Sequence, residues 1–408
     1  MKASNLLIAL SLLCSSLLLA EEKNESLDIY LSDSKKKQFK YDYEKIEAES
    51  SKLHDSWIAP IMLQYSYSKS KPYDVEQTSQ SAAIKMDQPI FQFGGIYYGV
   101  KFVDASKVYS DYSIDVAKRK LTKEAISLLM QIKQMGLMID KQNLVIKNSE
   151  ISLEQQKEQY LNGQLDSGFL DNAIIARNAV IQALYDMQTN KQRLISTFAT
   201  LSDMKYDDAI VPRLELLSEE KFLENNIVLN MTQSDIEKTS YNKKVTMAKY
   251  FPRISFTAGY NWSKTQNQQF SPTIPAFSSE KNYYDYGIRV SIPIDINTFS
   301  DIESSRVDYL KSRVVVEDKK RELKALFEQV MLNISNYEKK IALSVENKEI
   351  YEKLLADTVD LYKAGYKTNF DVELLKNSVN IQNIDSQIFE IDKQLELLSL
   401  YEMYKNDR

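Results

Sequence analysis

The sequence predicts an α+β protein that is mostly α-helical and internally duplicated, and three observations support this prediction. Glycine (9) and proline (8) are scarce among the 408 residues, so few positions interrupt helices. Seven of the eight prolines lie in two windows about 200 residues apart, 60–89 and 252–293, which indicates two copies of one unit. Apolar residues follow coiled-coil spacing between the windows and alternate at every second position inside them.

The composition excludes several classes of chemistry. The chain has one histidine, His54, and one cysteine, Cys14, which excludes disulfide scaffolds, Cys-rich zinc sites and redox Cys pairs. Lys and Arg total 52 against 57 Asp and Glu, leaving no basic excess for nucleic acid. No G-x-x-x-x-G-K phosphate loop occurs. We expect no enzymatic activity, no cofactor and no metal site; an enzyme, which would have to use His54 or a carboxylate pair, is kept as an alternative.

The first twenty residues have the pattern of a secretory signal peptide. Lys2 provides a short positive region, residues 6–19 are apolar but too few to span a bilayer comfortably, and Ala20 precedes a charged run. We predict cleavage after Ala20, which would leave the mature chain without cysteine. No later apolar run reaches the length of a membrane helix, so contact with a membrane would involve strands or a surface helix.

Similar segments support the duplication. The matching pairs are 59–65 with 251–257, 88–91 with 292–295, and 160–163 with 362–365. The first two pairs have offsets of 192 and 204, and we interpret the difference as a longer hairpin loop in the second copy. The predicted segments are a signal peptide (1–20), an N-terminal helical segment (21–58), a first β-hairpin (59–95), a first long helical hairpin (96–202), a linker (203–225), a helix (226–250), a second β-hairpin (251–296) and a second long helical hairpin (297–408).

Strict alternation predicts the four strands. In residues 254–262 apolar and aromatic side chains occupy every second position, with Ser255, Thr257 and Asn261 between them. Strands of roughly 10 residues with charges on one face are typical of a water-filled membrane barrel, although a soluble β-sandwich shows similar alternation. Four strands cannot close a barrel alone. The charges assigned to the lumen face are Lys85, Asp87, Asp285 and Arg289.

Heptad spacing predicts coiled-coil helices. Apolar residues recur at intervals of four and three within 121–160, 323–341 and 370–398, and Gln142 and Ser149 interrupt the first run. Two short helices placed end to end match a long one in length. The expected long helices are about 97–160 and 301–362, and the expected short ones are about 28–57, 169–200, 226–250 and 370–405.

Several motifs together resemble those of the TolC-like outer-membrane efflux proteins. They are Pro60 and Pro252 at strand starts, Gln-Pro-Ile-Phe-Gln-Phe-Gly-Gly at 88–95, Ser-Ile-Pro-Ile at 291–294, and the turn Leu-Tyr-Lys-Ala-Gly-Tyr-Lys-Thr-Asn-Phe-Asp-Val at 361–372. The resemblance implies a homotrimer in which four strands per chain form one 12-stranded outer-membrane β-barrel, continued by a long α-helical coiled-coil tunnel through the periplasm. The second copy departs from the family pattern with Asn-Thr-Phe at 297–299, where Gly-Gly is common.

The same resemblance implies a function. The expected protein is a channel-tunnel in the outer membrane of a Gram-negative envelope that exports small molecules or proteins, together with an inner-membrane transporter and a periplasmic adaptor protein. The cargo is not predicted. A periplasmic coiled-coil structural or interaction protein is the alternative; it accounts for the heptads and leaves the amphipathic strands unexplained.

The resemblance also implies a gate at the periplasmic entrance. Asp371 matches an aspartate that forms a ring at the family's constriction, and Tyr362 and Lys367 match residues that hold the first tip closed. Asp171 is the expected acceptor at that tip, although the first glycine turn is two residues longer than the second. A simpler interpretation is that Lys367 and Asp371 form an ordinary i,i+4 ion pair.

Overall fold

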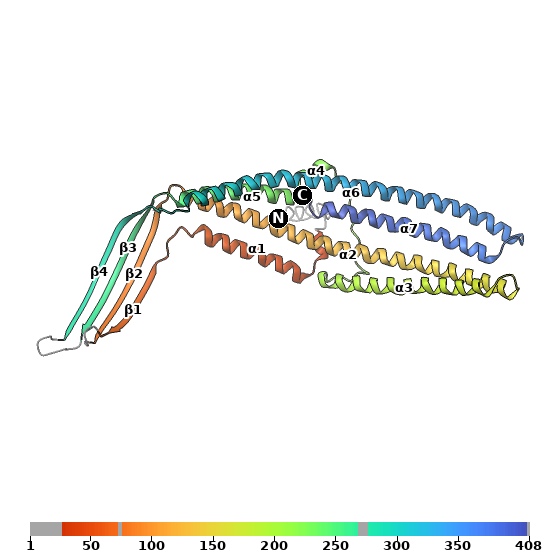
Figure 1. The fold of residues 1–408 in the computed structure, drawn as a ribbon, viewed down its shortest axis with the longest axis horizontal. Coiled ribbons are helices and arrows are strands. Elements are labelled where there is room, and N and C mark those ends of the chain that lie inside the picture. Colours follow the sequence, from red (N-terminus) through yellow and green to blue (C-terminus); the bar gives the residue numbers. More distant parts are fainter. Residues whose placement is uncertain (1–26, 72–75, 268–275, 406–408) are drawn as a thin grey trace, which may run out of the picture.

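The chain folds into an elongated molecule with a β-sheet at one end and helices along the rest of its length (Figure 1). The computed structural model describes residues 27–71, 76–267 and 276–405, so the signal peptide predicted for 1–20 lies outside the described residues. The elements are η1 (Leu27–Tyr30), α1 (Asp33–His54), β1 (Met62–Ser70), β2 (Gln77–Phe91), α2 (Gly95–Leu161), α3 (Ser167–Leu201), α4 (Glu219–Glu224), α5 (Ile227–Lys249), β3 (Arg253–Asn267), β4 (Phe277–Ser291), α6 (Thr298–Lys363) and α7 (Asn369–Tyr401).

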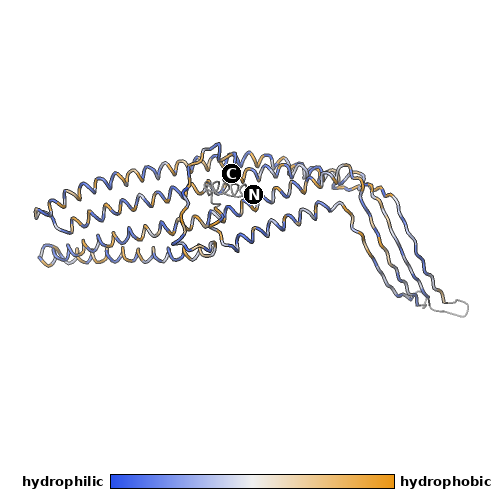
Figure 2. Tube along the Cα trace, turned by 180° about the vertical axis from the view of Figure 1, so that it is seen from behind, coloured by the Kyte–Doolittle hydropathy of each residue, from blue (hydrophilic) through white to orange (hydrophobic). Residues whose placement is uncertain are grey.

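Two helices, α2 and α6, run most of the length of the helical part (Figure 1). They have 67 and 66 residues, on the order of 100 Å each at 1.5 Å per residue, and contain no proline. Apolar and polar residues are interspersed along every helix (Figure 2). Among the described residues, no helix is both long enough and apolar enough to cross a membrane.

The shorter helices are placed end to end, and backbone hydrogen bonds join them. At the junction of α3 and α1, the Ser32 amide donates to the Leu201 carbonyl at 2.8 Å. At the junction of α7 and α5, the Ile227 amide donates to the Met403 carbonyl at 2.8 Å, and Asn226 pairs with Tyr404 in a β-bridge. The two copies of the duplicated unit therefore join their short helices in the same way.

The apolar core lies at these two junctions, midway along the helices. It combines Ala125 to Ile132 of α2, Phe198 and Leu201 of α3, Leu397 to Leu400 of α7 and part of the linker. The heptad residues of α6 that enter it, all buried, are Leu323, Phe327, Val330 and Ile334. The predicted heptad seam is thus best buried at mid-length, where the linker crosses the helices.

The four strands form one antiparallel sheet in the order β1-β2-β3-β4. The prediction of strands of roughly 10 residues is too short for β2, β3 and β4, which each have 15, because the ladders continue into polar ends such as 77–81, where backbone pairing needs no apolar side chain. We had also interpreted the greater length of the second hairpin as a longer loop, and this was wrong for the larger part of the difference. The two hairpins pair over 9 and 15 residues, so most of the added length lies in the strands.

The mid-length core provides a direct test of stability. Phe222 of α4 is fully buried, and its ring stacks on that of Phe327 with centroids 5.8 Å apart. We expect Phe222→Ala to lower the free energy of unfolding by about 3–5 kcal/mol, because it removes a buried ring and leaves a cavity. Leu216→Ala in the same linker, where the side chain is 58% exposed, should cost little. Denaturation followed by circular dichroism compares the two; equal losses would contradict this location of the core.

Candidate channel wall and helical tips

The sheet has one apolar face and one polar face. The cross-strand register places Leu63, Ile84, Tyr260 and Tyr284 in one row, and Phe256 beside Ile288 in another, all on the same face. These side chains are exposed in the single chain, Leu63 by 78% and Ile288 by 72%. The apolar rows extend from Ile254 to Trp262, roughly 27 Å at 3.3 Å per residue, which matches the apolar band of a membrane barrel.

The four charges predicted for the lumen lie together on the opposite face. Lys85 and Asp285 both pair with Gly259, one from each side, and the Arg289 guanidinium forms an ion pair with the Asp87 carboxylate at 2.7 Å. A side chain at 259 would approach the Asp285 carboxylate to 2.8 Å, so glycine leaves room for that carboxylate. Two positive and two negative side chains therefore form one charge-balanced belt.

The same face holds a residue that the sequence reasoning missed. Tyr283 pairs with Asn261 two register positions beyond the row of Gly259 and Asp285 and is 57% exposed. The sequence analysis assigned only the charged residues Asp285 and Arg289 of this strand to the polar face, although strict alternation places Tyr283 there as well. Ser255, which was assigned to the polar face, is only 4% exposed and therefore does not offer its hydroxyl to a channel.

The joint between sheet and helices is fixed by side chains from both β-hairpins. The Gln88 amide accepts from the Ala59 amide at 2.9 Å and donates to the Trp57 carbonyl at 3.0 Å, tying the chain after α1 to the base of β2. The ring of Phe93 packs on that of Phe251, with centroids 5.3 Å apart. Between the end of α5 and the start of α6, the Tyr250 hydroxyl donates to the Asp301 carboxylate. This hydrogen bond raises the pKa of Tyr250 to about 12.

The two glycine turns lie at the far end of the helices (Figure 1) and share one geometry. In the second turn the Tyr366 amide donates to the Leu361 carbonyl and the Gly365 amide to the Tyr362 carbonyl, both at 2.9 Å; the first turn repeats this pattern at 159–164. Gly163 and Gly365 have φ of 71° and 84°, a left-handed conformation that favours glycine. The predicted gate residues Tyr362 and Lys367 are exposed beside the second turn.

Asp371 begins α7 as part of a capping box. Its amide donates to the Thr368 hydroxyl at 3.3 Å, and its carboxylate accepts from the Thr368 amide at 3.0 Å. The bond from the Thr368 amide lowers the pKa of Asp371 below its ordinary value, so this carboxylate is charged at neutral pH. Lys367 precedes the helix and makes no ion pair within 4 Å with Asp371, so the two do not form an i,i+4 helical pair, although the charge of Lys367 also contributes to the lowered pKa of Asp371.

Asp171 lies at the other tip and has a different setting. It is exposed and sits in the second turn of α3, five residues beyond the N-cap Asp166, whereas Asp371 is three residues beyond its own N-cap. The position equivalent to Asp371 is therefore Phe169, which is 56% exposed. The structure brings both tips to one end of the molecule, and among the described residues no hydrogen bond joins Asp171 to Tyr362 or Lys367.

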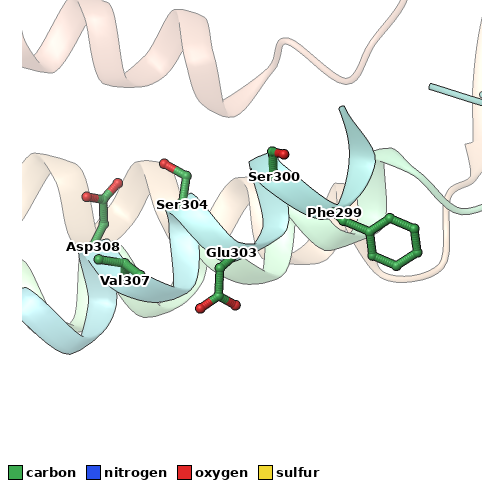
Figure 3. Close-up of a pocket in the computed structure, with 6 residues that line it drawn as sticks. All are labelled: Phe299, Ser300, Glu303, Ser304, Val307 and Asp308. Carbon is green, nitrogen blue, oxygen red and sulfur yellow. The ribbon is translucent and has the colours of Figure 1, made fainter. Parts of the chain in front are cut away.

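A shallow hollow of about 500 Å³ lies on α6 just beyond the sheet. It is formed by side chains of this one helix, and Phe299 points away from the helix at its end (Figure 3). Phe299 is 85% exposed, and Ile294 and Ile296 before it are more than 90% exposed. An apolar surface of this kind is free for another surface to cover. The lining residues are Phe299, Ser300, Glu303, Ser304, Val307 and Asp308.

The chain is similar to known outer-membrane channels. A family model described as "Outer membrane efflux protein" matches residues 220–395, and no curated protein sequence matches significantly. The fold is similar to that of the outer membrane protein VceC of Vibrio cholerae (TM-score 0.67, 14% identity, 90% of this chain and 92% of that chain covered). It is also similar to the CmeC outer membrane channel of Campylobacter jejuni (0.71, 11%, 94% and 86%) and to the open state of the MtrE outer membrane channel of Neisseria gonorrhoeae (0.68, 11%, 92% and 87%).

These findings confirm three of the sequence predictions. The likeness to solved channels bears out the α+β, mostly α-helical fold class. The matched family bears out the resemblance to the TolC-like efflux proteins. Because that family consists of outer membrane efflux proteins, it also bears out the prediction of an export channel in the outer membrane.

Adjacent residues on the two faces of β1 test the orientation of the wall. Leu63 lies on the apolar face and Gln64 on the polar face, and both are exposed in the single chain. We expect Leu63→Arg to lower the stability of the membrane-inserted form by about 2 kcal/mol, because it places a charge in the lipid, whereas Gln64→Arg should be tolerated. Quantifying folded protein in outer-membrane fractions compares them; similar yields would contradict a lipid-facing row at Leu63.

Proposed function

We propose that this chain forms a homotrimeric channel-tunnel, with one 12-stranded barrel in the outer membrane and a helical tunnel in the periplasm. The observation that carries the proposal is the sheet, which has an exposed apolar face, a polar face and two end strands, β1 and β4. Unpaired strand edges inside a membrane are costly, so the sheet must be continued by further strands. Three copies give the even number of strands that bacterial barrels have.

The channel is passive in this proposal, and no residue carries out a chemical reaction. The energy for export comes from an inner-membrane transporter, to which a periplasmic adaptor protein joins the tunnel. The exposed tips at 162–166 and 364–368 are the parts of the chain farthest from the sheet, which suits contact with such partners. The belt of Lys85, Asp87, Asp285 and Arg289 gives the barrel a polar wall.

The gate is proposed at the second tip. Asp371 from three chains would form a ring of carboxylates, and its lowered pKa keeps that ring charged at neutral pH. Tyr362 and Lys367 stand beside it and would bind the first tip, with Asp171 as the acceptor. A ring of carboxylates in a narrow pore favours cations and binds multivalent ones.

Assembly can be measured directly. We expect the detergent-solubilised protein to have the mass of a trimer, because a four-stranded sheet leaves two edges that neighbouring copies must pair. Native mass spectrometry and chemical cross-linking provide the measurement. A monodisperse monomer that still conducts ions across a bilayer would contradict the proposed barrel.

The gate can be tested with variants that separate charge from capping. Asp371→Asn removes the charge and keeps an oxygen that can accept from the Thr368 amide, so cation selectivity should fall and block by multivalent cations should weaken. Thr368→Ala removes a capping partner and keeps the charge, so it should preserve selectivity. Tyr362→Phe combined with Lys367→Ser should raise the single-channel conductance.

Planar-bilayer recordings of reversal potential and conductance measure these effects. Unchanged selectivity in Asp371→Asn, together with unchanged conductance in the double variant, would show that the gate lies elsewhere. A loss of selectivity in Thr368→Ala equal to that in Asp371→Asn would assign the effect to the helix start rather than to the charge.

A further inference from the structure

Helix α1 has a counterpart in the second copy, which is α5. Each of the two precedes the first strand of its β-hairpin, and each packs on the long helix of its own copy, α1 on α2 and α5 on α6. The Tyr250–Asp301 contact between α5 and α6 corresponds to positions 58 and 97 when the offsets of 192 and 204 are subtracted. The Glu47–Lys107 ion pair between α1 and α2 lies 11 residues before the first position and 10 after the second. The two contacts therefore have the same antiparallel register to within one residue.

Helix α5 also has a second partner, and α1 does not have the equivalent one within the chain. On its other side α5 packs on α2, where a Cβ added at Gly95 would lie 3.2 Å from the Ala248 Cβ and the Lys238 ammonium lies 3.9 Å from the centre of the Tyr109 ring. By the duplication, the equivalent partner of α1 is α6. These two helices lie at opposite edges of the helical layer (Figure 1), and α1, all of whose residues are described, has no buried residue. Only α6 of another copy can complete this contact.

The first half of α6 carries an exposed stripe on the side away from α5. The side toward α5 is marked by Ser312, whose hydroxyl lies 2.9 Å from that of Thr239, and by Tyr309, whose ring lies under the Lys243 ammonium. Positions two residues away from these lie on the opposite side of the helix, since each residue turns it by about 100°. An exposed apolar row of this kind indicates a surface that a partner covers. The members of this edge stripe, all exposed, are Phe299, Glu303, Val307, Leu310 and Val314.

The contact between α2 and α5 provides the register for that partner. Gly95 and Ala248 correspond to Phe299 and Ser56 by the same offsets, so Phe299 lies opposite Ser56 when α1 of another copy packs on the edge stripe. Moving along the two antiparallel helices from this pair brings apolar residues and opposite charges together, which favours one register. The facing pairs are Glu303 with Lys52, Val307 with Ala48, Lys311 with Glu44, Val314 with Tyr41 and Asp318 with Lys37.

Phe299 is the member of the edge stripe that differs most from its counterpart. Gly95 fits closely against α5 of its own chain, whereas the ring of Phe299 stands where the family commonly has glycine and points away from α6 (Figure 3). In the register above it meets Ser56, which is small, and Leu53 and Trp57 beside it are exposed. A small residue leaves room for the ring, and its exposed neighbours provide the apolar surface that a buried aromatic side chain needs.

We infer that Phe299 is an anchor between copies, which packs on Ser56, Leu53 and Trp57 of the next copy, and that the edge stripe binds α1 of that copy. The inference rests on the proposed homotrimer, and it identifies the helical surface, the register and the side chain by which the copies recognise one another. The contact continues the one between the sheets, because α1 leads into β1 and α6 follows β4, and these are the two edge strands.

Cross-linking measures the register. Phe299→Cys combined with Ser56→Cys places two thiols at facing positions, and the natural Cys14 lies in the predicted signal peptide. A short bifunctional thiol reagent added to outer-membrane fractions should convert this double variant into covalent dimers and trimers, and neither single-cysteine variant should react in this way. The matched control is Lys311→Cys with Ser56→Cys. It moves one thiol roughly 18 Å along α6 at 1.5 Å per residue and should give at least tenfold less product.

A second variant tests the anchor without cysteines. Phe299→Ala should increase several-fold the rate at which the detergent-solubilised trimer dissociates on warming, followed by native mass spectrometry. Ile210→Ala, which truncates a side chain of similar exposure in the linker, should leave that rate unchanged. This comparison decides the question if the double-cysteine variant fails to assemble.

Two results would rule out the anchor. They are a Phe299–Ser56 cysteine pair that gives no more product than its control, and a Phe299→Ala trimer that dissociates no faster than the Ile210→Ala trimer. A ring that contacts membrane lipid instead of the next copy would give both. An unchanged protein that is monomeric throughout would refute the proposed function itself, whereas an intact trimer with either negative result would refute the anchor alone.

Discussion

The arrangement of the whole chain depends on the strict alternation of its four strands. A sheet that is apolar on one face and polar on the other needs an apolar cover for the first and water for the second, and since the described helices of this chain do not pack on the sheet, lipid is the cover that suits it. Its backbone adds a second requirement, because the outer edges of β1 and β4 need partners wherever water is absent. The residues at the joint follow from the same constraint: Gln88 and the ring pair Phe93–Phe251 attach the helices to the sheet at its base.

The duplication gives the tunnel wall two equivalent sets of helices. Each copy has one long helix, and two short helices placed end to end form a second layer of similar length. A backbone hydrogen bond joins the short helices, between Ser32 and Leu201 in one copy and between Ile227 and Met403 in the other. These junctions would be weak points in a coiled coil. The linker covers both junctions, and Phe222 of this segment stacks on Phe327. The apolar core therefore lies where the helical layer is interrupted, and it stabilises the two junctions.

Periodicity in the sequence was sufficient to predict the helices, the strands and which strand residues share a face. It was insufficient where structure does not depend on apolar side chains. The polar strand ends, for example at 77–81, are held by the backbone ladder, and Tyr283 was missed because only charged residues were assigned to the polar face of β4. The capping box of Thr368 and Asp371 has a local sequence pattern that can be recognised. The sequence analysis considered only an ion pair of Asp371 with Lys367 at this position. The pairs Gln134–Asp392 and Lys141–Asp385 join residues more than 240 positions apart, and their partners follow only from the packing of α2 on α7.

The contacts between the helices change in character along their length. At mid-length, burial of aliphatic and aromatic side chains makes any separation of the helices costly. Toward the tips the contact between hairpins becomes polar and the turns carry exposed Tyr362 and Lys367. Polar pairs also join α6 and α7 within the second hairpin, among them Lys393 with Glu338 and Lys348 with Asn383. The hairpins are therefore held together by a buried apolar core at mid-length and by directional polar contacts toward the tips.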